Sequence, residues 1–455
     1  MPRFCGAGAI MDEANTKIYL LSLGCAKNLV NSELMLGRLR AAGMEICDSP
    51  EGADAAIVNT CGFIDSAKSE AIEAILELAE LKKQGLIRAL IVTGCLTQRY
   101  QSEFLTELPE VDAALGTGSY DSIVEAVRGA LAGREHGAYF DPREHSLLMG
   151  ERVLLTPGYS AYLRIAEGCD NCCSFCVIPK IRGRFRSVPM EELEAEARRL
   201  AAAGTRELLV VAQDITRYGL DLYGKCSLAE LLCRLERIEG LHWIRLHYLY
   251  PDEMDDELLE VIAASRKILH YFDIPIQHVN DRILKAMNRR GSGALIRERI
   301  ARLRALVPDA VIRTSLIVGF PGETEAEYRE LYDFLEEYRL ERVGVFCYSQ
   351  EEGTAAAVMP DQIPEEIKER RRAEIYALQE QIMDAFSRKQ IGRTLEVLCC
   401  GRDEEGCFGR SYMDSVEIDG TVYFESEHAR EGDFVTVRVD YAEGCDLYGR
   451  ALSEV

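Results

Sequence analysis

The sequence predicts an α/β protein in three parts: an open parallel α/β sheet, a central partial (β/α)6 barrel of the TIM kind, and a small antiparallel β-barrel of the OB-like kind. Two observations predict this. Apolar β-rich runs alternate with helical patterns in two long blocks, and a last block has short strands between glycines and acidic turns. We place the first part at residues 16–132, a linker at 133–157, the central barrel with its exit helix at 158–390, and the last part at 391–455.

The first block repeats a strand, a loop and a helix four times, with helices expected at 32–42 and 65–83. The four strands are expected in the runs KIYLLSLGC, DAAIVNTC, ALIVTGC and DAALGT. Three of them end in cysteine: Cys25, Cys61 and Cys95. Because the carboxyl ends of parallel strands meet at one edge of a sheet, these three thiols can meet at one point.

The second block contains six strand patterns separated by helical segments, followed by a charged helix at 364–389. The third block contains five short strands. The expected strands lie in SAYLRIAEG, ELLVVAQD, HWIRLHYLYP, ILHYFDIPIQ, VIRTSLIVGF and RVGVFCYS, then in RTLEVLCCG, GCFGRSY, VYFESE, DFVTVRVDYAE and LYGRAL.

Composition excludes several classes of protein. The chain has 455 residues, 47% of them apolar, and no biased tract, so it is neither a short peptide module nor largely disordered. It shows no secretory signal pattern and no apolar run of about 18 residues, which predicts a cytoplasmic protein without a membrane span. In a reducing cytosol, sixteen cysteines indicate metal binding or redox chemistry rather than disulfides.

The charge is strongly acidic. The formal net charge of −23 repels phosphate backbones, so direct nucleic-acid binding is not expected and a basic or neutral partner is favoured. The last block carries six arginines, no lysine and fifteen acidic residues, a formal charge of −9. Because a negative charge repels RNA phosphates, this block is not expected to bind RNA.

The run EGCDNCCSFC follows the first strand of the second block and places Cys169, Cys173 and Cys176 at C-x3-C-x2-C spacing. Thiolates are the usual ligands of iron–sulfur clusters, and three of them leave one iron of a cubane unligated by protein. A zinc loop with a distant fourth ligand is the alternative. Cys172 does not fit the spacing as well, and we interpret it as a bystander.

Weaker motifs lie at other strand ends. The GFPGET turn contains Gly319, Pro321 and Gly322, which either approach a ligand closely or form an ordinary Pro-Gly turn. Further polar groups at strand ends either line the cavity or cap helices; they are Gln213, Asp214, Asp273, Gln277 and His278. The cationic run IRGRFRS either meets a substrate carboxylate or forms a solvated face, the commoner use of such a run, through Arg182, Arg184 and Arg186.

With its cysteine loop after the first barrel strand, the chain resembles the radical S-adenosylmethionine (SAM) enzymes. The resemblance implies that the open iron holds SAM and that one electron cleaves it to a 5′-deoxyadenosyl radical. It also implies that SAM is bound near Gln213, Asp214, Gln277, Gly319, Pro321 and Gly322. A reductant such as flavodoxin or ferredoxin would supply the electron.

The contexts SLGCAKNLVNSE, VNTCGFIDSAKSE and VTGCLTQRY narrow the resemblance to the methylthiotransferases, whose C-terminal β domain is of the TRAM type. This implies a second, auxiliary [4Fe-4S] cluster on Cys25, Cys61 and Cys95, the use of two SAM molecules, and both clusters facing one cavity. The TRAM-like domain is expected to hold the substrate at the barrel mouth.

Within that family, the motifs SLGCAKN, DNCCSFCVIPKIRG and GRSYMDSVEIDG are similar to those of one branch. That branch modifies small-subunit ribosomal protein S-twelve at the β-carbon of an aspartate side chain. A basic ribosomal protein also suits the acidic charge. The alternatives are methylthiolation of a transfer-RNA adenosine, which predicts a basic track on the third domain, a simpler radical methylase whose N-terminal cysteines bind nothing stable, and a non-catalytic iron–sulfur or zinc protein.

Overall fold

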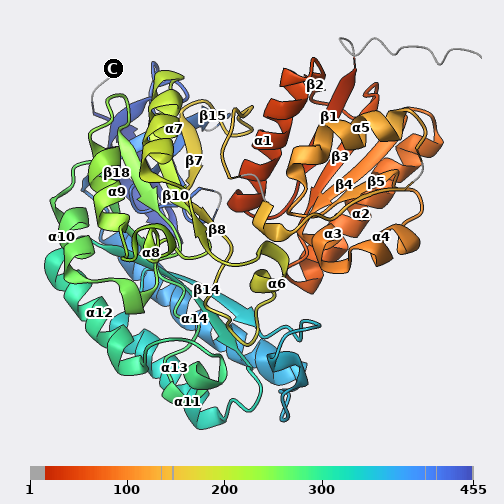
Figure 1. The fold of residues 1–455 in the computed structure, drawn as a ribbon. Helices are drawn as coiled ribbons and strands as arrows, with labels where there is room; N and C mark the ends of the chain where they lie inside the picture. Colours follow the sequence, from red (N-terminus) through yellow and green to blue (C-terminus); the bar gives the residue numbers. More distant parts are fainter. Residues whose placement is uncertain (1–15, 135, 146–147, 405, 417, 453–455) are drawn as a thin grey trace, which may run out of the picture. The chain divides into compact units, whose positions relative to one another are not determined.

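The computed structural model of the chain describes residues 16–134, 136–145, 148–404, 406–416 and 418–452. They form two compact units (Figure 1). The first contains Met1–Leu155 and Val177–Arg184, and the second contains Thr156–Cys176 and Phe185–Val455. Within the described ranges, no helix is both long enough and apolar enough to cross a membrane.

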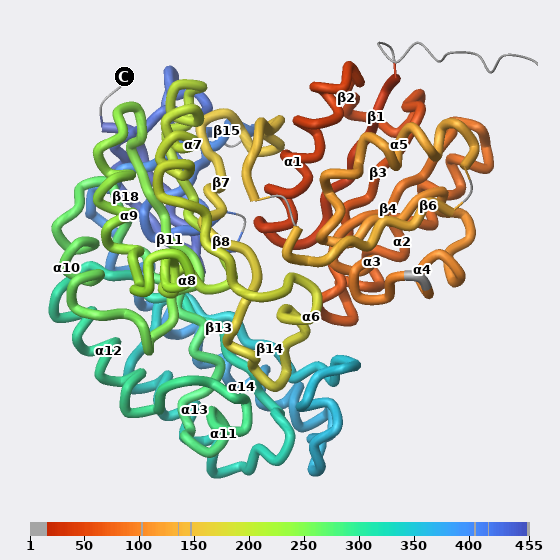
Figure 2. The backbone as a smooth tube through the Cα atoms, in the orientation of Figure 1, coloured from red at the N-terminus to blue at the C-terminus, as the bar shows by residue number. Residues whose placement is uncertain are grey.

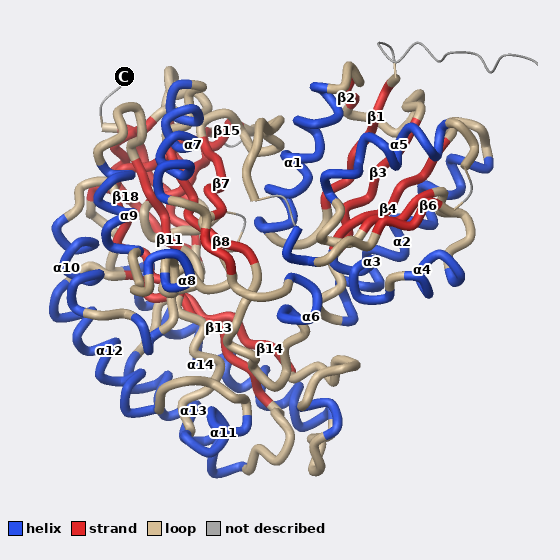
Figure 3. The backbone as a smooth tube through the Cα atoms, in the orientation of Figure 1, coloured by secondary structure: helices blue, strands red, loops and turns tan. Residues whose placement is uncertain are grey.

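The first unit contains a six-stranded sheet in which every neighbouring pair is parallel, in the order β2-β1-β3-β4-β5-β6 (Figure 3). The strands are β1 (Lys17–Ser22), β2 (Glu45–Cys47), β3 (Ala55–Thr60), β4 (Ala89–Gly94), β5 (Ala113–Leu115) and β6 (Gly137–Tyr139). This confirms the predicted parallel α/β sheet. The edge strands β2 and β6 were not predicted because their sequences, EIC and GAY, contain no continuous apolar run, and β6 lies in the expected linker at 133–157.

Helices cover both faces of this sheet. On β3, Ala55 and Ile57 pack in one apolar cluster and Ala56 and Val58 in another, so the first four residues of the strand are apolar on both faces. The helices are α1 (Ala26–Ala41), α2 (Asp65–Lys83), α3 (Cys95–Tyr100), α4 (Ser102–Glu107), α5 (Ile123–Leu131) and α6 (Ile178–Arg182), with 3-10 turns η2 (Tyr120–Ser122) and η3 (Arg143–His145). Helix α2 has the predicted bounds, whereas α1 begins at Ala26 instead of Ser32 because its polar first turn is buried.

The second unit contains a six-stranded parallel sheet in the order β14-β13-β12-β11-β10-β7. Its strands are β7 (Ser160–Arg164), β10 (Glu207–Val211), β11 (Trp243–Leu246), β12 (Ile268–Asp273), β13 (Val311–Val318) and β14 (Arg342–Cys347). Its helices are α7 (Met190–Ala202), α8 (Leu220–Tyr223), α9 (Leu228–Glu236), α10 (Asp256–Ala264), α11 (Asp281–Ala286), α12 (Gly293–Leu306), α13 (Glu325–Tyr338) and α14 (Glu365–Arg388), with 3-10 turns η4 (Pro251–Glu253) and η5 (Ala356–Val358). Six parallel strands joined by helices confirm the predicted (β/α)6 architecture.

The C-terminal strands close into a five-stranded barrel in the order β15-β16-β17-β19-β18. They are β15 (Thr394–Arg402), β16 (Cys407–Ser411), β17 (Val422–Glu425), β18 (Phe434–Glu443) and β19 (Asp446–Ala451). All pairs are antiparallel except β17 with β19, which is parallel. The chain enters this barrel from the long helix α14 (Figure 2).

The barrel packs against the starts of the parallel strands in the second unit. Trp243, the first residue of β11, and Val311, the first of β13, belong to the same apolar cluster as the barrel interior. Glu207, the first residue of β10, binds Arg410 of β16 and Arg245 of β11. The cysteine loop instead follows the carboxyl ends of these strands. The barrel therefore does not lie at the mouth, where the sequence analysis expected it, because apolar strand starts bind it to the opposite edge. Its expected role in holding the substrate stays a prediction.

Candidate metal centres

In the first unit, three cysteines follow three neighbouring strands at the carboxyl edge of the sheet. Cys25 precedes the first turn of α1, Cys61 follows β3 directly, and Cys95 follows β4 and begins α3. Since β1, β3 and β4 are adjacent, their three loops lie side by side. The structure thus brings together the three residues that the sequence singled out.

Glycines let these loops pack closely. Gly24 has φ +87°, and a Cβ atom placed on it would lie 2.7 Å from the Cβ of Cys61. Gly94 has φ +105°, and a Cβ atom there would lie 2.5 Å from the carbonyl oxygen of Thr60. Both distances are too short for a real side chain. The glycine before Cys25 and the glycine before Cys95 are therefore needed for the approach of the loops.

Two buried asparagines tie the loops together, and the sequence analysis did not assign them. Asn28 Nδ2 donates to the carbonyl oxygens of Leu23 (2.7 Å) and Thr60 (3.2 Å). Asn59 Nδ2 donates to the carbonyl of Asn28 (2.9 Å) and to Ser32 Oγ (2.8 Å). Their position within the SLGCAKN and VNTC motifs was the available signal. These bonds hold the Cys25 and Cys61 loops in a fixed relation.

Arg182 lies against the N-terminal cysteines. Only 3% of it is exposed, and its Nη2 donates to Cys95 Sγ (3.2 Å) and to Asn28 Oδ1 (3.1 Å). A solvated face, one of the two expected uses of the IRGRFRS run, is therefore wrong for Arg182, although Arg184 is exposed. The structure places Arg182 beside a thiol because α6 packs with the first unit.

The charges around these thiols differ. Burial acts to raise the pKa of the Cys25 thiol, but the positive charges of Lys27 and Arg182 outweigh it and lower that pKa. Burial raises the pKa of the Cys61 thiol to about 12, and negative charge on Cys95 and Cys25 adds to the effect. The negative charges of the three sulfur atoms therefore act on one another, as those of the ligands of one centre would.

The second cysteine loop leaves the sheet of the second unit after β7. The short strands β8 (Ala166–Glu167) and β9 (Arg186–Ser187) pair antiparallel and close its base. Ser174 Oγ donates to the carbonyl of Ala286 (2.8 Å), and Asn171 Nδ2 donates to Asp214 Oδ2 (2.9 Å). The loop is thus fixed at two points to the sheet and its helices.

Within this loop the four cysteines have different surroundings. Cys169 is buried, whereas Cys172 is exposed, has φ +51°, and its carbonyl accepts a hydrogen bond from Asn288 Nδ2 (2.8 Å). Burial raises the pKa of the Cys169 thiol to about 12, and negative charge on Cys173 adds to the effect. Cys173 and Cys176 are partly exposed, and the backbone N–H of Cys176 donates to the carbonyl of Cys173 (3.0 Å).

An arginine also lies beside the second group of cysteines. Arg289 Nη1 donates to Cys173 Sγ (3.8 Å), and the guanidinium lies over the ring of Tyr250, 4.4 Å from its centroid. Each cysteine group thus combines three thiols with a cationic donor, which is buried in the case of Arg182 and partly buried in the case of Arg289. This donor set fits an iron–sulfur cluster, whose thiolate ligands carry negative charge that a guanidinium offsets.

Two of the expected SAM residues lie close to the second cysteine loop. Gln213 Nε2 donates to Glu167 Oε1 (2.8 Å), and Asp214 accepts the hydrogen bond from Asn171 that fixes the loop. Asn171 Oδ1 and Gln213 Oε1 are buried and have no hydrogen-bond donor among the described residues. Two such acceptors fit a ligand that carries an ammonium group, as SAM does.

The remaining expected SAM residues are engaged by the protein itself. Gly319 N donates to Glu323 Oε2 (2.7 Å), and a Cβ atom on Gly319 would lie 2.3 Å from Cγ of Lys368, so packing by itself accounts for this glycine. Pro321 is buried, and Gly322 N donates to the carbonyl of Asp361 (2.8 Å). Gln277 extends the sheet through backbone bonds to Ser315 and Ile317, and its side chain is partly exposed. The buried polar groups Asp273 and His278 bind Arg313 and Glu323 respectively.

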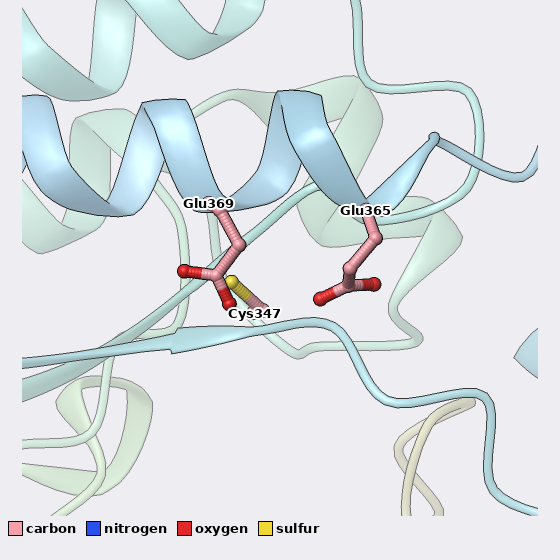
Figure 4. A group of neighbouring side chains, drawn as sticks. All are labelled: Cys347, Glu365 and Glu369. Carbon is pink, nitrogen blue, oxygen red and sulfur yellow. The ribbon is translucent and has the colours of Figure 1, made fainter.

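A third group of possible ligands lies at the end of β14. The ligand atoms of Cys347, Glu365 and Glu369 all lie within 4.8 Å of one another, with both carboxylates on α14 (Figure 4). Lys368 binds Glu365, and Arg372 binds Glu369. Because a cation of the protein already pairs with each carboxylate, this group does not indicate a metal site.

Comparison with protein families covers most of the chain in three segments. Residues 17–116 match the uncharacterized protein family UPF0004, residues 163–335 match the radical SAM superfamily, and residues 391–452 match the TRAM domain. The radical SAM match implies SAM and a [4Fe-4S] cluster.

Solved structures with the same fold are distant in sequence. The radical SAM methyltransferase TsrM from Kitasatospora setae, solved with cobalamin and a [4Fe-4S] cluster, has a TM-score of 0.56 and 15% identity and covers 73% of this chain and 75% of its own. The cobalamin-dependent radical SAM enzyme OxsB, solved with cobalamin and SAM, has a TM-score of 0.50 and 12% identity over 81% of this chain and 56% of its own. These structures show a shared fold.

Relatives are much closer over the whole length. A ribosomal protein uS12 methylthiotransferase RimO from Lachnoclostridium phytofermentans is 48% identical, covering 96% of this chain and 100% of its own. A second, from Desulforamulus reducens, is 50% identical over 95% of this chain and 98% of its own. The chain therefore belongs to the RimO family of radical SAM methylthiotransferases.

Proposed function

We propose that this protein methylthiolates ribosomal protein uS12, at the β-carbon of an aspartate side chain. The family membership supports the reaction, and the convergence of Cys25, Cys61 and Cys95 is the observation that carries it. A simpler radical methylase would need only the loop of the second unit. The acidic charge of the chain supports a basic protein as substrate. A cytoplasmic reaction stays the expectation from the sequence patterns.

We propose that Cys169, Cys173 and Cys176 hold the [4Fe-4S] cluster that SAM binds, and that the N-terminal triad holds the auxiliary cluster. When bound, these groups and SAM supply the radical chemistry and the sulfur that the family uses. The β-hydrogen of aspartate is neither acidic nor next to a leaving group, so acid–base catalysis by side chains has little effect on it. The residues of the chain instead bind and orient SAM and the substrate, and they exclude water from the site.

Gln213 and Asp214 contribute in different ways to the proposed SAM site. Gln213 Oε1 and Asn171 Oδ1 are placed to accept hydrogen bonds from the SAM ammonium group, which supports the expected role of Gln213. Asp214 positions Asn171. The GFPGET turn, with Gly319, Pro321 and Gly322, and Gln277 stay candidates for the adenosyl moiety, since they lie in the loops that follow β13 and β12.

Both cysteine triads would act on one substrate molecule. The chain passes from Cys176 to Arg182, which lies beside Cys95, within six residues. This short connection supports a shared reaction. An external reductant, a flavodoxin or a ferredoxin by analogy with the family, would supply the electron for the cluster on Cys169, Cys173 and Cys176.

The test is anaerobic incubation of the reconstituted, reduced protein with SAM and either uS12 or transfer RNA, followed by mass spectrometry. The expected result is a mass increase of one methylthio group on the protein. The same mass increase on transfer RNA would overturn the proposal that uS12 is the substrate. Cys25→Ala is expected to abolish the transfer, and full transfer by Cys25→Ala would overturn the role of the auxiliary cluster.

The ligand assignment in the second unit is tested by a pair of neighbouring variants. Cys173→Ala is expected to lose one cluster, about four of about eight irons per chain, because it removes a ligand. Cys172→Ala is expected to keep all the iron, because Cys172 is exposed and has a left-handed backbone. The reverse pattern in iron and sulfide assays would reassign the loop to Cys172.

A further inference from the structure

Helix α6 carries a buried cation to the N-terminal thiols. The segment Val177–Arg184 follows the second cysteine loop in sequence but is part of the first unit. Ile181 packs in an apolar cluster with Cys95 and Val177, and its carbonyl accepts a hydrogen bond from Thr117 Oγ1 (2.7 Å) at the end of β5. These contacts fix the helix immediately before Arg182.

The guanidinium of Arg182 contacts all three cysteine loops, directly or through one residue. Its Nη2 lies 3.2 Å from Cys95 Sγ and 3.1 Å from Asn28 Oδ1. Asn28 in turn binds the carbonyls of Leu23 and Thr60, which precede Cys25 and Cys61. Arg182 is thus fixed by the same network that fixes the cysteines.

A guanidinium in this position acts on a cluster in a defined way. It is always charged, and its planar shape lets it keep two acceptors at once. Hydrogen bonds to the sulfur ligands are among the factors that set the reduction potential of iron–sulfur clusters. Because the reduced cluster carries one more negative charge, a cationic donor on a ligand sulfur stabilises the reduced form and raises the potential.

We propose that Arg182 is a positioning residue of the auxiliary cluster, which orients the Cys95 thiolate and raises the reduction potential of the cluster. The inference rests on the proposed function for the presence of iron at Cys25, Cys61 and Cys95.

The experiment uses the full chain with Cys169, Cys173 and Cys176 replaced by alanine, so that the N-terminal triad is the only one of the two left. About four irons per chain are expected after anaerobic reconstitution. A reductive titration followed by electron paramagnetic resonance then gives the potential in this parent and in Arg182→Gln, Arg182→Lys and Lys180→Gln variants. Lys180 lies on the same helix, has the same charge and is exposed, so it controls for charge alone.

Arg182→Gln is expected to lower the potential, Arg182→Lys to lower it less, and Lys180→Gln to leave it unchanged. A purely structural role would lower the thermal midpoint of the iron-free chain and leave the potential of the assembled cluster unmoved. An unshifted potential in both Arg182 variants, or an equal shift in Lys180→Gln, would overturn the inference.

Two outcomes separate this inference from the proposed function. If the parent binds no iron, the auxiliary cluster itself is absent, and both fail. If the parent binds iron but Arg182→Gln does not, the titration of Arg182→Lys decides. That variant keeps the charge but has no fork to hold both Asn28 Oδ1 and Cys95 Sγ, so an unchanged potential there overturns the role of Arg182.

Discussion

Single atoms decide how closely the N-terminal cysteines approach one another. The Cα atom of Gly24 lies where any side chain would collide with Cys61, and the adjacent Cys25 depends on that contact. A methyl group on Gly24 would push apart two of the three loops. Ligand geometry tolerates little displacement, since a centre has to be held by all its ligands at once.

Gly24→Ala is expected to lose iron from the N-terminal triad and to keep the iron of the second cysteine loop. Iron and sulfide assays should fall from about eight to about four atoms of each per chain. The cause is the 2.7 Å distance between the added Cβ and Cys61 Cβ.

Gly43→Ala is the matched control. Gly43 has the same φ of +87°, but a Cβ atom placed on it would meet none of the described residues within 4 Å, so the substitution costs only the backbone strain, about 1 kcal/mol. Equal iron loss in both variants would show that strain, and not the contact with Cys61, governs the site.

At the scale of elements, α1 is held in place by a buried charge. Glu33 in the middle of α1 is fully buried and accepts hydrogen bonds from Arg152 Nη1 (3.2 Å) and from the backbone N–H of Leu155 (3.0 Å). Because α1 also carries Cys25 at its start, this ion pair fixes one side of the triad. The segment after β6 therefore belongs structurally to the first unit.

Glu33→Gln is expected to lower the free energy of unfolding of the first unit by about 3–5 kcal/mol, since the buried Arg152 guanidinium loses its counter-charge. Denaturant unfolding followed by circular dichroism measures this. Asp121→Asn removes the exposed pair of Asp121 with Arg38 of α1 and is expected to cost about 0–1 kcal/mol. Equal losses in the two variants would contradict the role of burial.

At the scale of the whole molecule, one buried carboxylate joins the C-terminal barrel to the parallel sheet of the second unit. Burial acts to raise the pKa of Glu207, but Arg410 and Arg245 outweigh it and lower that pKa to about 2. The folded state therefore holds this proton less tightly than the unfolded state, whose pKa is near 4.5. The stability that Glu207 contributes is complete above about pH 4.5 and is lost as the pH falls towards 2.

The thermal midpoint is therefore expected to fall more steeply between pH 4.5 and 2 in the wild type than in Glu207→Gln, which has no carboxylate to titrate. At neutral pH the variant should be less stable by about 3–5 kcal/mol, because two buried arginines lose their partner. Calorimetry at several pH values measures both effects. Parallel pH profiles would contradict the assignment.

The net charge of −23 acts over the whole surface. A basic substrate is expected to bind less well at high salt, since the Debye screening length falls from about 10 Å at 0.1 M to about 3 Å at 1 M ionic strength. KM for uS12 should rise several-fold over this range while kcat changes little. A triple variant, Glu425→Gln, Glu427→Gln and Glu443→Gln, removes exposed charge from the barrel and should flatten that dependence. A KM independent of salt would contradict steering by charge.

Much of the fold could be predicted because its signals are local. Alternation of strands and helices predicts both parallel sheets, and α2 appears with its expected bounds. The edge strands β2 and β6 could not be predicted, since EIC and GAY have no apolar run of the kind that predicts the equally short β5, and they pair only once a neighbouring strand exists. Gly319 shows the same limit, because its close neighbour Lys368 comes from a distant helix.

From the sequence we could predict the candidate ligands and the kind of partner. The candidate ligands are two sets of three cysteines, one at the ends of three strands and one in a single loop, and the acidic charge favours a basic partner. Only the folded chain shows that Arg182 donates a hydrogen bond to the sulfur of Cys95. It also shows that the C-terminal barrel packs at the edge of the sheet opposite the second cysteine loop. The spacing of residues along the chain predicts the candidate cluster ligands and the secondary-structure elements. Contacts between distant residues depend on which apolar surfaces pack together, and no local pattern specifies that.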